Sequence, residues 1–217
     1  MKTICIVGNS PPIKGLGLGG KIDSHDIVIR IGRFYCDPHD FGTKVTHWYI
    51  GPWALWSHSL KQNISISFLD DKIAFFNNSA GPKLLHLLGW SKMNSGWKTE
   101  DIEELLANVS KSCSDVEVVQ HEGGVPMPPE LLVYYPEEKN QISGVRIYPT
   151  LGARIVHHYV KNHRKVTIAG FGGDKKGVKE IAAAIAGFHD LETDYRLIDI
   201  LIDAGKIENI EGTYIYR

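Results

Sequence analysis

A short apolar segment at the beginning of the chain ends at residues that could bind a phosphate. Ile4–Val7 is an apolar run, and Gly8, Asn9 and Ser10 follow it directly. Apolar runs of about four to eight residues bounded by turn-forming residues are typical of buried strands in parallel sheets. Open α/β sheets bind ligands at the carboxyl ends of their strands, where glycine lets the backbone approach an anion and Asn and Ser add donors. This segment therefore predicts a phosphate- or nucleotide-binding turn.

Two alternatives for the same region are a dinucleotide-binding fingerprint and a plain solvated loop. Gly15–Gly20 is rich in glycine, but the fingerprint must open a helix directly after a strand, and Gly8–Pro12 does not match it. In a solvated loop the glycines would only form turns.

Two turns in the second half of the chain border an expected helix and an expected strand. The turn 150–152 precedes a segment with helical spacing of apolar residues, and the turn 170–172 follows the β-branched run Val166–Ala169. The amino end of a helix offers unpaired N–H groups and a partial positive charge to a carboxylate or phosphate. Together these segments indicate a second βα crossover.

One histidine stands at the start of an expected helix and has three interpretations, one of them a general base. His189 stands just before a segment that has acidic residues, Asp190 and Glu192, in its expected first turn. A neutral imidazole can accept a proton near neutral pH, although packing at a helix start and simple exposure are the alternatives. Four further histidines are interpreted as packing, surface or structural residues, with a position near the ligand as the alternative for His47: His25, His47, His157 and His158.

The sequence predicts neither a metal site nor a cofactor. No pair of histidines or cysteines has metal-ligand spacing, and no Asp-x-Asp follows an expected strand. The charges, 24 Lys and Arg against 25 Asp and Glu, argue against nucleic acid as a partner. No apolar run is long enough to span a bilayer.

These residues require an α/β framework to bring them together. The 217 residues suit a single domain with a mostly parallel, Rossmann-like sheet. The patterns predict seven strands, at 4–7, 27–31, 45–50, 72–76, 116–119, 145–150 and 166–169. They favour helices at 82–90, 100–110 and 151–163 and within 187–210, and an irregular loop at 123–144.

Three segments of the chain resemble the sialylmotifs of the eukaryotic-type sialyltransferases, glycosyltransferase family 29. The large motif is matched by Val7–Ser10, the Gly17/Gly19 region, Ile22–Arg30 and Asp40–His47. The small motif is matched by Thr150-Leu151-Gly152 and by the distance from Gly152 to Gly170, and the very small motif by His189 with Asp194 five positions on. The matching regions are 1–50 and 145–210, and the resemblance implies that 51–144 is a variable acceptor-side region.

The resemblance implies a GT-A-like sandwich that binds a CMP-sugar donor and a glycan acceptor without a metal. It implies transfer of sialic acid with inversion, His189 being the catalytic base. The donor-binding residues it implies are Gly8, Asn9, Ser10, Arg30, Thr150, Gly152, Gly170, Phe171 and Gly172.

Some positions depart from the family pattern and leave other functions open. The family usually has Asn where this chain has Gly32, and Thr where it has Leu151. Another CMP-activated sugar acid such as CMP-Kdo, or a nucleotide-binding module without transfer activity, are alternatives. An unrelated Rossmann-type oxidoreductase or methyltransferase is a third class.

The cysteines favour a reducing compartment. Golgi members of the family join the large and small motifs by a disulfide, at positions that are Ile4 and His163 here. The odd, sparse set of three cysteines suits a cytoplasmic protein, the alternative being a soluble fragment of a Golgi enzyme.

Overall fold

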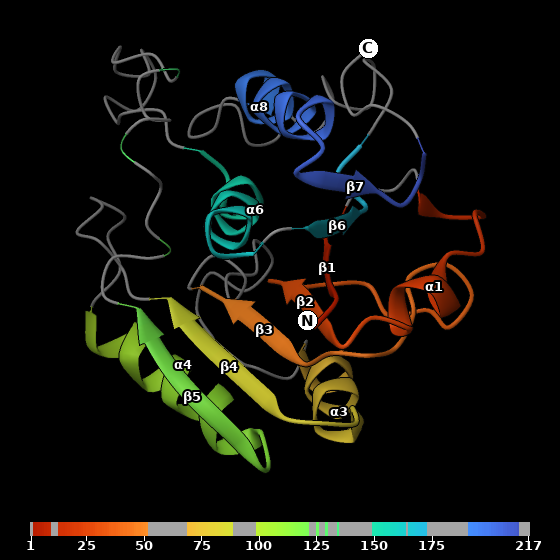
Figure 1. Ribbon diagram of the computed structural model, residues 1–217. Helices are drawn as coiled ribbons and strands as arrows, with labels where there is room; N and C mark the ends of the chain where they lie inside the picture. Colours follow the sequence, from red (N-terminus) through yellow and green to blue (C-terminus); the bar gives the residue numbers. More distant parts are fainter. Residues whose placement is uncertain are drawn as a thin grey trace.

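The computed structural model of the chain describes residues 2–9, 13–51, 69–88, 99–121, 149–163, 165–172 and 191–212, and three single positions, 125, 129 and 134. Its strands are β1 (Ile4–Val7), β2 (Ile27–Ile31), β3 (His47–Ile50), β4 (Lys83–Leu88), β5 (Val116–His121), β6 (Val166–Ala169) and β7 (Ile207–Asn209). Its helices are α1 (Gly19–Asp23), α3 (Asp70–Asn78), α4 (Thr99–Ser112), α6 (Leu151–Asn162) and α8 (Leu191–Asp203) (Figure 1).

The strands form one sheet in the order β5-β4-β3-β2-β1-β6-β7, and every neighbouring pair is parallel. From β1 the chain proceeds outward to β5 and then returns to place β6 on the other side of β1. This reversal of strand order is the topological switch point of a doubly wound sheet. The α/β class and the Rossmann-like parallel sheet predicted from the sequence are therefore confirmed.

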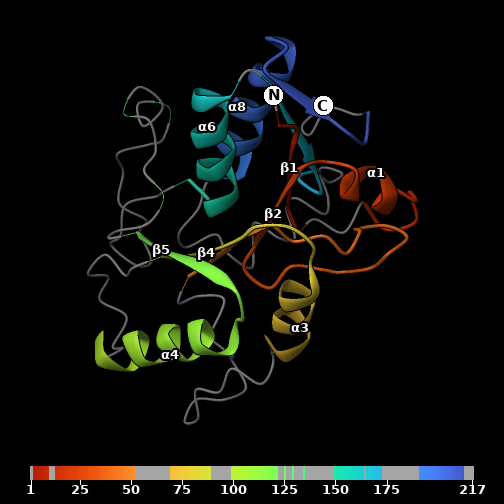
Figure 2. The same ribbon diagram turned by 60° about the horizontal axis from the view of Figure 1, so that its bottom comes forward.

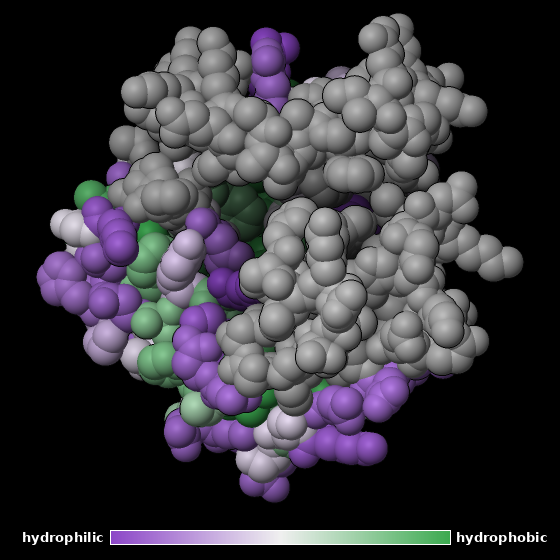
Figure 3. All heavy atoms as spheres, turned by 180° about the vertical axis from the view of Figure 1, so that it is seen from behind, coloured by the Kyte–Doolittle hydropathy of each residue, from purple (hydrophilic) through white to green (hydrophobic). Residues whose placement is uncertain are grey.

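Helices cover both faces of the sheet. α6 and α8 lie on one face, and α3 and α4 lie on the other (Figure 1, Figure 2). The alternation of side chains along β1 shows why its apolar run is continuous. Ile4 and Ile6 join the core under α6 and α8, whereas Cys5 and Val7 join the core that includes Ile22 of α1. On the face in Figure 3 the periphery of the described residues is largely hydrophilic, with hydrophobic atoms further inward.

Two predicted elements have the opposite secondary structure. Residues 72–76, predicted as a strand, lie in α3, where Ile73 and Phe76 are three positions apart and bury one face of the helix. Asp70 and Asp71 in its first turn favour the helix. Residues 82–90, predicted as a helix, contain β4, whose Leu88 joins the core under α6 and α8 while Leu85 and Leu87 join the core under α3 and α4. In both segments the spacing of apolar residues predicted the wrong secondary structure, because burial in the tertiary structure overrides local preference.

All three cysteines lie in the described part of the chain, and none forms a disulfide. Cys5 is buried in β1, and burial raises the pKa of its thiol to about 12. Ile4 belongs to the same buried strand, and His163 caps α6. Among the described helices, none has the length and apolar character required to cross a bilayer.

Candidate functional site

The turns after β1 and β6 touch each other at the switch point. The N–H of Gly8 donates to the carbonyl of Ala169 at 2.8 Å, which continues the parallel ladder beyond the strands. A Cβ on Gly8 would collide with the carbonyl oxygen of Gly170, and a Cβ on Gly170 would lie 2.7 Å from the carbonyl oxygen of Gly8. Gly170 also has a φ of +67°, which glycine adopts without strain. These two glycines are therefore required by the packing of the backbone.

The ring of Phe171 lies between the turn after β1 and the start of α6. A Cβ on Gly8 would lie 3.2 Å from Phe171 Cδ2, and a Cβ on Gly152 would lie 3.0 Å from Phe171 Cε1. The ring is buried and belongs to the core under α6 and α8. The structure thus brings together residues that are more than a hundred positions apart in the sequence.

Asn9 links the carboxyl ends of β1 and β2. Its Nδ2 donates to the carbonyl of Ile31 at 2.9 Å, and the residue is otherwise exposed. The amide is therefore held in place at the edge of the sheet where ligands of open α/β sheets bind.

The amino terminus of α6 is capped from two directions. Thr150 is the N-cap residue, and its Oγ1 accepts from the N–H of Ala153 at 3.2 Å. The N–H of Thr150 donates to Asp194 Oδ2 at 2.9 Å. The N–H groups of Leu151 and Gly152 occupy the first two helical positions, which have no acceptor inside the helix. They are the donors that this helix end can offer to an anion.

The side chain of Arg30 has a different environment from the one expected for a donor-binding residue. It is fully buried, and its Nη2 donates to the carbonyl of Phe41 at 2.7 Å. Its Nε donates to the carbonyl of Lys44 at 3.2 Å. The guanidinium therefore supports the segment between β2 and β3, because its donors point to backbone carbonyls there.

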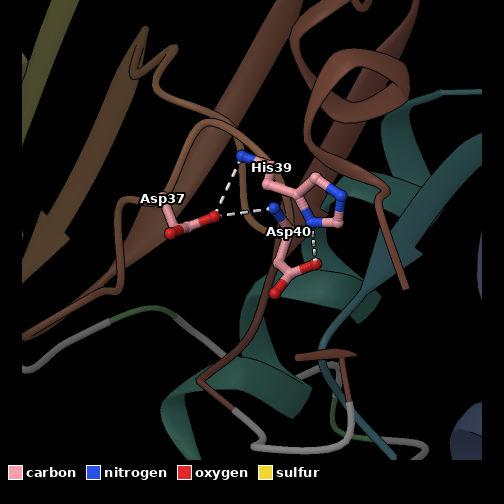
Figure 4. Close-up of side chains that lie close together, drawn as sticks. All are labelled: Asp37, His39 and Asp40. Carbon is pink, nitrogen blue, oxygen red and sulfur yellow. Dashed lines mark hydrogen bonds and ion pairs between the residues drawn. The ribbon is translucent and has the colours of Figure 1, made fainter. Parts of the chain in front are cut away.

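The acidic residues around Gly15–Gly19 also stabilise loops. Asp37, His39 and Asp40 form the one cluster of three potential metal-binding side chains found among the described residues (Figure 4). Asp40 Oδ2 accepts from Gly15 N–H at 2.7 Å and Oδ1 from Gly17 N–H at 3.0 Å, and these bonds lower the pKa of Asp40. Asp37 Oδ1 accepts the N–H groups of His39 and Asp40. The cluster is accounted for by these backbone contacts.

Several histidines lie in the interior. His47 and His86 are stacked at 5.6 Å between ring centroids, and His86 stacks on Tyr49 at 3.9 Å. Burial lowers the pKa of His86 to about 3 and the pKa of His47 and of His157 to about 4. The buried positions of His47 and His157 agree with a structural or packing role.

Two predicted site residues, Ser10 and His189, lie outside the described residues. The remaining predicted residues of the turns, among them Gly172, meet at the carboxyl edge of β1 and β6.

Glu211 lies at the same edge and was not among the predicted site residues. Its Oε1 accepts from the N–H of Gly170 at 2.5 Å. Burial raises the pKa of its carboxyl group, while the Gly170 hydrogen bond lowers it. The sequence offered little signal, because the preceding strand β7 has only three residues and no apolar alternation.

Known proteins similar to this chain are sialyltransferases. The profile of glycosyltransferase family 29 (sialyltransferase) matches residues 1–206. CMP-N-acetylneuraminate-beta-galactosamide-alpha-2,3-sialyltransferase 2 of Rattus norvegicus is 26% identical over 219 aligned positions, which cover 95% of this chain and 56% of that protein. The corresponding sialyltransferase 1 of Mus musculus is 24% identical over 230 positions, covering 95% and 58%. The chain thus spans just over half the length of these relatives.

Two solved structures share the fold. A crystal structure of a mammalian sialyltransferase aligns with a TM-score of 0.57 at 20% identity, covering 98% of this chain and 70% of that one. A crystal structure of a mammalian sialyltransferase in complex with Gal-beta-1-3GalNAc-ortho-nitrophenol gives 0.55 at 19% identity, with the same coverage.

Proposed function

Because this chain belongs to glycosyltransferase family 29, we propose that it transfers sialic acid from CMP-sialic acid to a hydroxyl group of an acceptor sugar. The observation that carries the proposal is the contact of Gly8, Gly152 and Phe171 at the switch point. These residues come from the segments that resemble the large and small sialylmotifs, and a switch point is where doubly wound sheets bind nucleotides.

In the proposed complex, Asn9 and Ser10 bind the phosphate and ribose of the donor, and Gly170–Gly172 border the cytidine. The sialic acid carboxylate lies at the amino terminus of α6. Since the N–H and Oγ1 of Thr150 already form hydrogen bonds within the protein, the N–H groups of Leu151 and Gly152 are the donors for that carboxylate. Thr150 then acts by shaping the turn.

His189 is the proposed general base. It accepts the proton of the acceptor hydroxyl while the hydroxyl oxygen attacks the anomeric carbon of the sialic acid. The bond between that carbon and the phosphate oxygen breaks, CMP leaves from the opposite face, and the configuration is inverted. A monophosphate leaving group does not require a bridging metal ion, so we propose a metal-independent reaction. α8 begins two residues after His189, and its Asp194 is anchored to Thr150.

The departures from the family pattern leave two alternatives to the transfer of sialic acid. The donor could be a different CMP-activated sugar acid, or the protein could bind a nucleotide without transferring a sugar. Gly32 is the position to consider, because its φ of +57° lies in the left-handed region. Asn adopts that region more readily than most residues with side chains. The backbone therefore suits the Asn that the family usually has, and what is missing is its side chain.

Release of CMP tests the proposal. The protein is incubated with CMP-sialic acid or CMP-Kdo, with and without Gal-beta-1-3GalNAc, in the presence of EDTA. We expect acceptor-dependent release of CMP from CMP-sialic acid and a sialylated product by mass spectrometry. Binding of CMP without a sialylated product would support a nucleotide-binding module. Faster release of CMP from CMP-Kdo would identify that compound as the donor. Activity that needs manganese would refute the metal-independent mechanism.

A further inference from the structure

The carboxylate of Glu211 takes the place of a backbone acceptor at the end of the sheet. The ladder between β6 and β7 pairs Ile168 with Asn209, and the N–H of Ile210 donates to the carbonyl of Ile168 at 3.0 Å. Two positions beyond Ile168, just after β6 ends, the N–H of Gly170 donates to Glu211 Oε1. The carboxylate is thereby held beside the turn that touches Gly8.

Only one of the two carboxylate oxygens of Glu211 has a partner in the described part of the chain. Oε1 accepts from Gly170, whereas Oε2 has no hydrogen bond there and lies 3.7 Å from the position of a Cβ on Gly172. The side chain is half-buried, so the free oxygen keeps some access to solvent. This oxygen is therefore available to accept a hydrogen bond from a ligand.

The position of Glu211 in the fold indicates which ligand group it faces. The units β1–α1–β2 and β6–α8–β7 lie on either side of the switch point. In dinucleotide-binding sheets, an acidic residue after the second strand of such a unit accepts hydrogen bonds from ribose hydroxyls. Glu211 follows the second strand of its unit, and an ionised carboxylate is an acceptor only.

We propose that Glu211 recognises the ribose of the donor nucleotide, with Oε2 accepting hydrogen bonds from its hydroxyl groups while Oε1 holds the Gly170 turn. This inference rests on the proposed function, because it assumes that a nucleotide binds at the switch point. It adds a selectivity for ribonucleotides to the proposed donor site.

Glu211→Gln tests the inference with little change of shape. The amide oxygen of Gln can still accept from Gly170, but the amide nitrogen replaces the free acceptor with a donor. The matched control is Glu208→Gln, which neutralises a carboxylate of β7 that pairs with Lys165 at the surface. Dissociation constants are measured calorimetrically for CMP, 2′,3′-dideoxy-CMP and UMP, and thermal melting without ligand checks folding.

We expect the wild type and Glu208→Gln to bind CMP about tenfold or more tightly than dideoxy-CMP, and Glu211→Gln to lose most of that preference. An unchanged preference in a folded Glu211→Gln protein would overturn the inference while leaving the proposed function intact. A change confined to the preference for CMP over UMP would also overturn it and assign the carboxylate to the cytosine amine. Failure of the wild type to bind any of these nucleotides would refute both proposals.

Discussion

The N–H of Thr150 donates a hydrogen bond to Asp194 Oδ2 across 44 residues of sequence. In a capping box, the side chain at the third helical position bonds to the N–H of the N-cap residue. Here that position is Ala153, which has no polar side chain, and Asp194 of α8 supplies the carboxylate instead. The turn that begins α6 and the helix that follows His189 are thereby held in one arrangement.

Loss of the Asp194 carboxylate is expected to destabilise the protein and to impair transfer. Asp194 is 1% exposed, so Asp194→Ala leaves a part-buried N–H of Thr150 without its acceptor and should cost about 1–3 kcal/mol in the free energy of unfolding. Urea denaturation measures this cost. Glu192→Ala is the control in the same helix, since the exposed Glu192–Arg196 pair should contribute less than about 1 kcal/mol. Equal effects of the two variants would contradict the capping role.

A methyl group at Gly8 is expected to separate the two turns at the switch point. Gly8→Ala places a Cβ against the carbonyl oxygen of Gly170, and overpacking of this kind costs about 1–3 kcal/mol. CMP binding should weaken as well, because the backbone must shift where the phosphate is proposed to lie. Gly20→Ala is the control, because a Cβ there meets nothing within 4 Å. A Gly8→Ala protein with wild-type melting temperature and CMP affinity would be inconsistent with the close contact.

Removal of the Asn9 amide is expected to weaken CMP binding by about tenfold or more, since a hydrogen bond to a charged phosphate contributes about 1.5–3 kcal/mol. Asn9→Ala also removes the bond to the carbonyl of Ile31, and Asn9→Asp is a companion that removes the same bond, because a carboxylate cannot donate. Asp keeps the size but adds a charge that repels phosphate, and it should bind CMP more weakly than the Ala variant. Titration calorimetry of folded variants makes the comparison, and an unaltered dissociation constant in both would place the nucleotide elsewhere.

Substitution of His189 separates catalysis from binding. If His189 is the base, His189→Ala should reduce transfer by about 10²–10⁴-fold and leave CMP affinity nearly unchanged. Transfer by the wild type should also fall on acidification, because only neutral imidazole accepts a proton. His39→Ala, at an exposed position, is the control. Wild-type turnover in folded His189→Ala would end the assignment and direct attention to Asp190, since the Asp194 carboxylate is buried and bonded to Thr150.

The buried histidines predict a loss of stability in acid. The pKa of His86 is lowered to about 3 and that of His47 and His157 to about 4, whereas an unfolded histidine titrates near 6.5. The unfolded state therefore binds more protons below about pH 6.5, and each histidine removes up to about 1.4 kcal/mol of stability per pH unit until its folded pKa is reached. Stability is complete above pH 6.5 and falls from there toward pH 4.

Urea denaturation of the wild type and of His86→Phe at pH 7 and pH 5 measures this dependence. The variant should lose less stability between the two pH values, since Phe keeps an aromatic ring against Tyr49 and has no proton to bind. A wild type with equal stability at pH 7 and pH 5 would contradict the buried, neutral state of these histidines.

The sequence by itself determined β1 and β6, the two strands whose carboxyl ends meet at the switch point. Ile4–Val7 is apolar on every residue, and Val166–Ala169 is apolar except at Thr167, because both faces of a central parallel strand are covered and every residue of these two strands is buried. The glycines that follow them also stand out, since the backbone contact between Gly8 and Gly170 admits no side chain. The apolar runs and the glycines that follow them can be recognised in the local sequence, although the contact that requires the glycines forms only in the folded chain.

The tertiary structure alone decided the contacts between distant segments. Arg30 lies in a matching motif, yet its guanidinium is buried against carbonyls of another loop. Asp194 caps a helix 44 positions away, and Glu211 reaches Gly170 because β7 pairs with β6. A side chain can bond to whichever backbone group folding brings near, and no periodicity in the sequence records that choice. The secondary structure of α3 and β4 was also decided by tertiary packing, because their apolar residues are buried in one core with neighbouring strands.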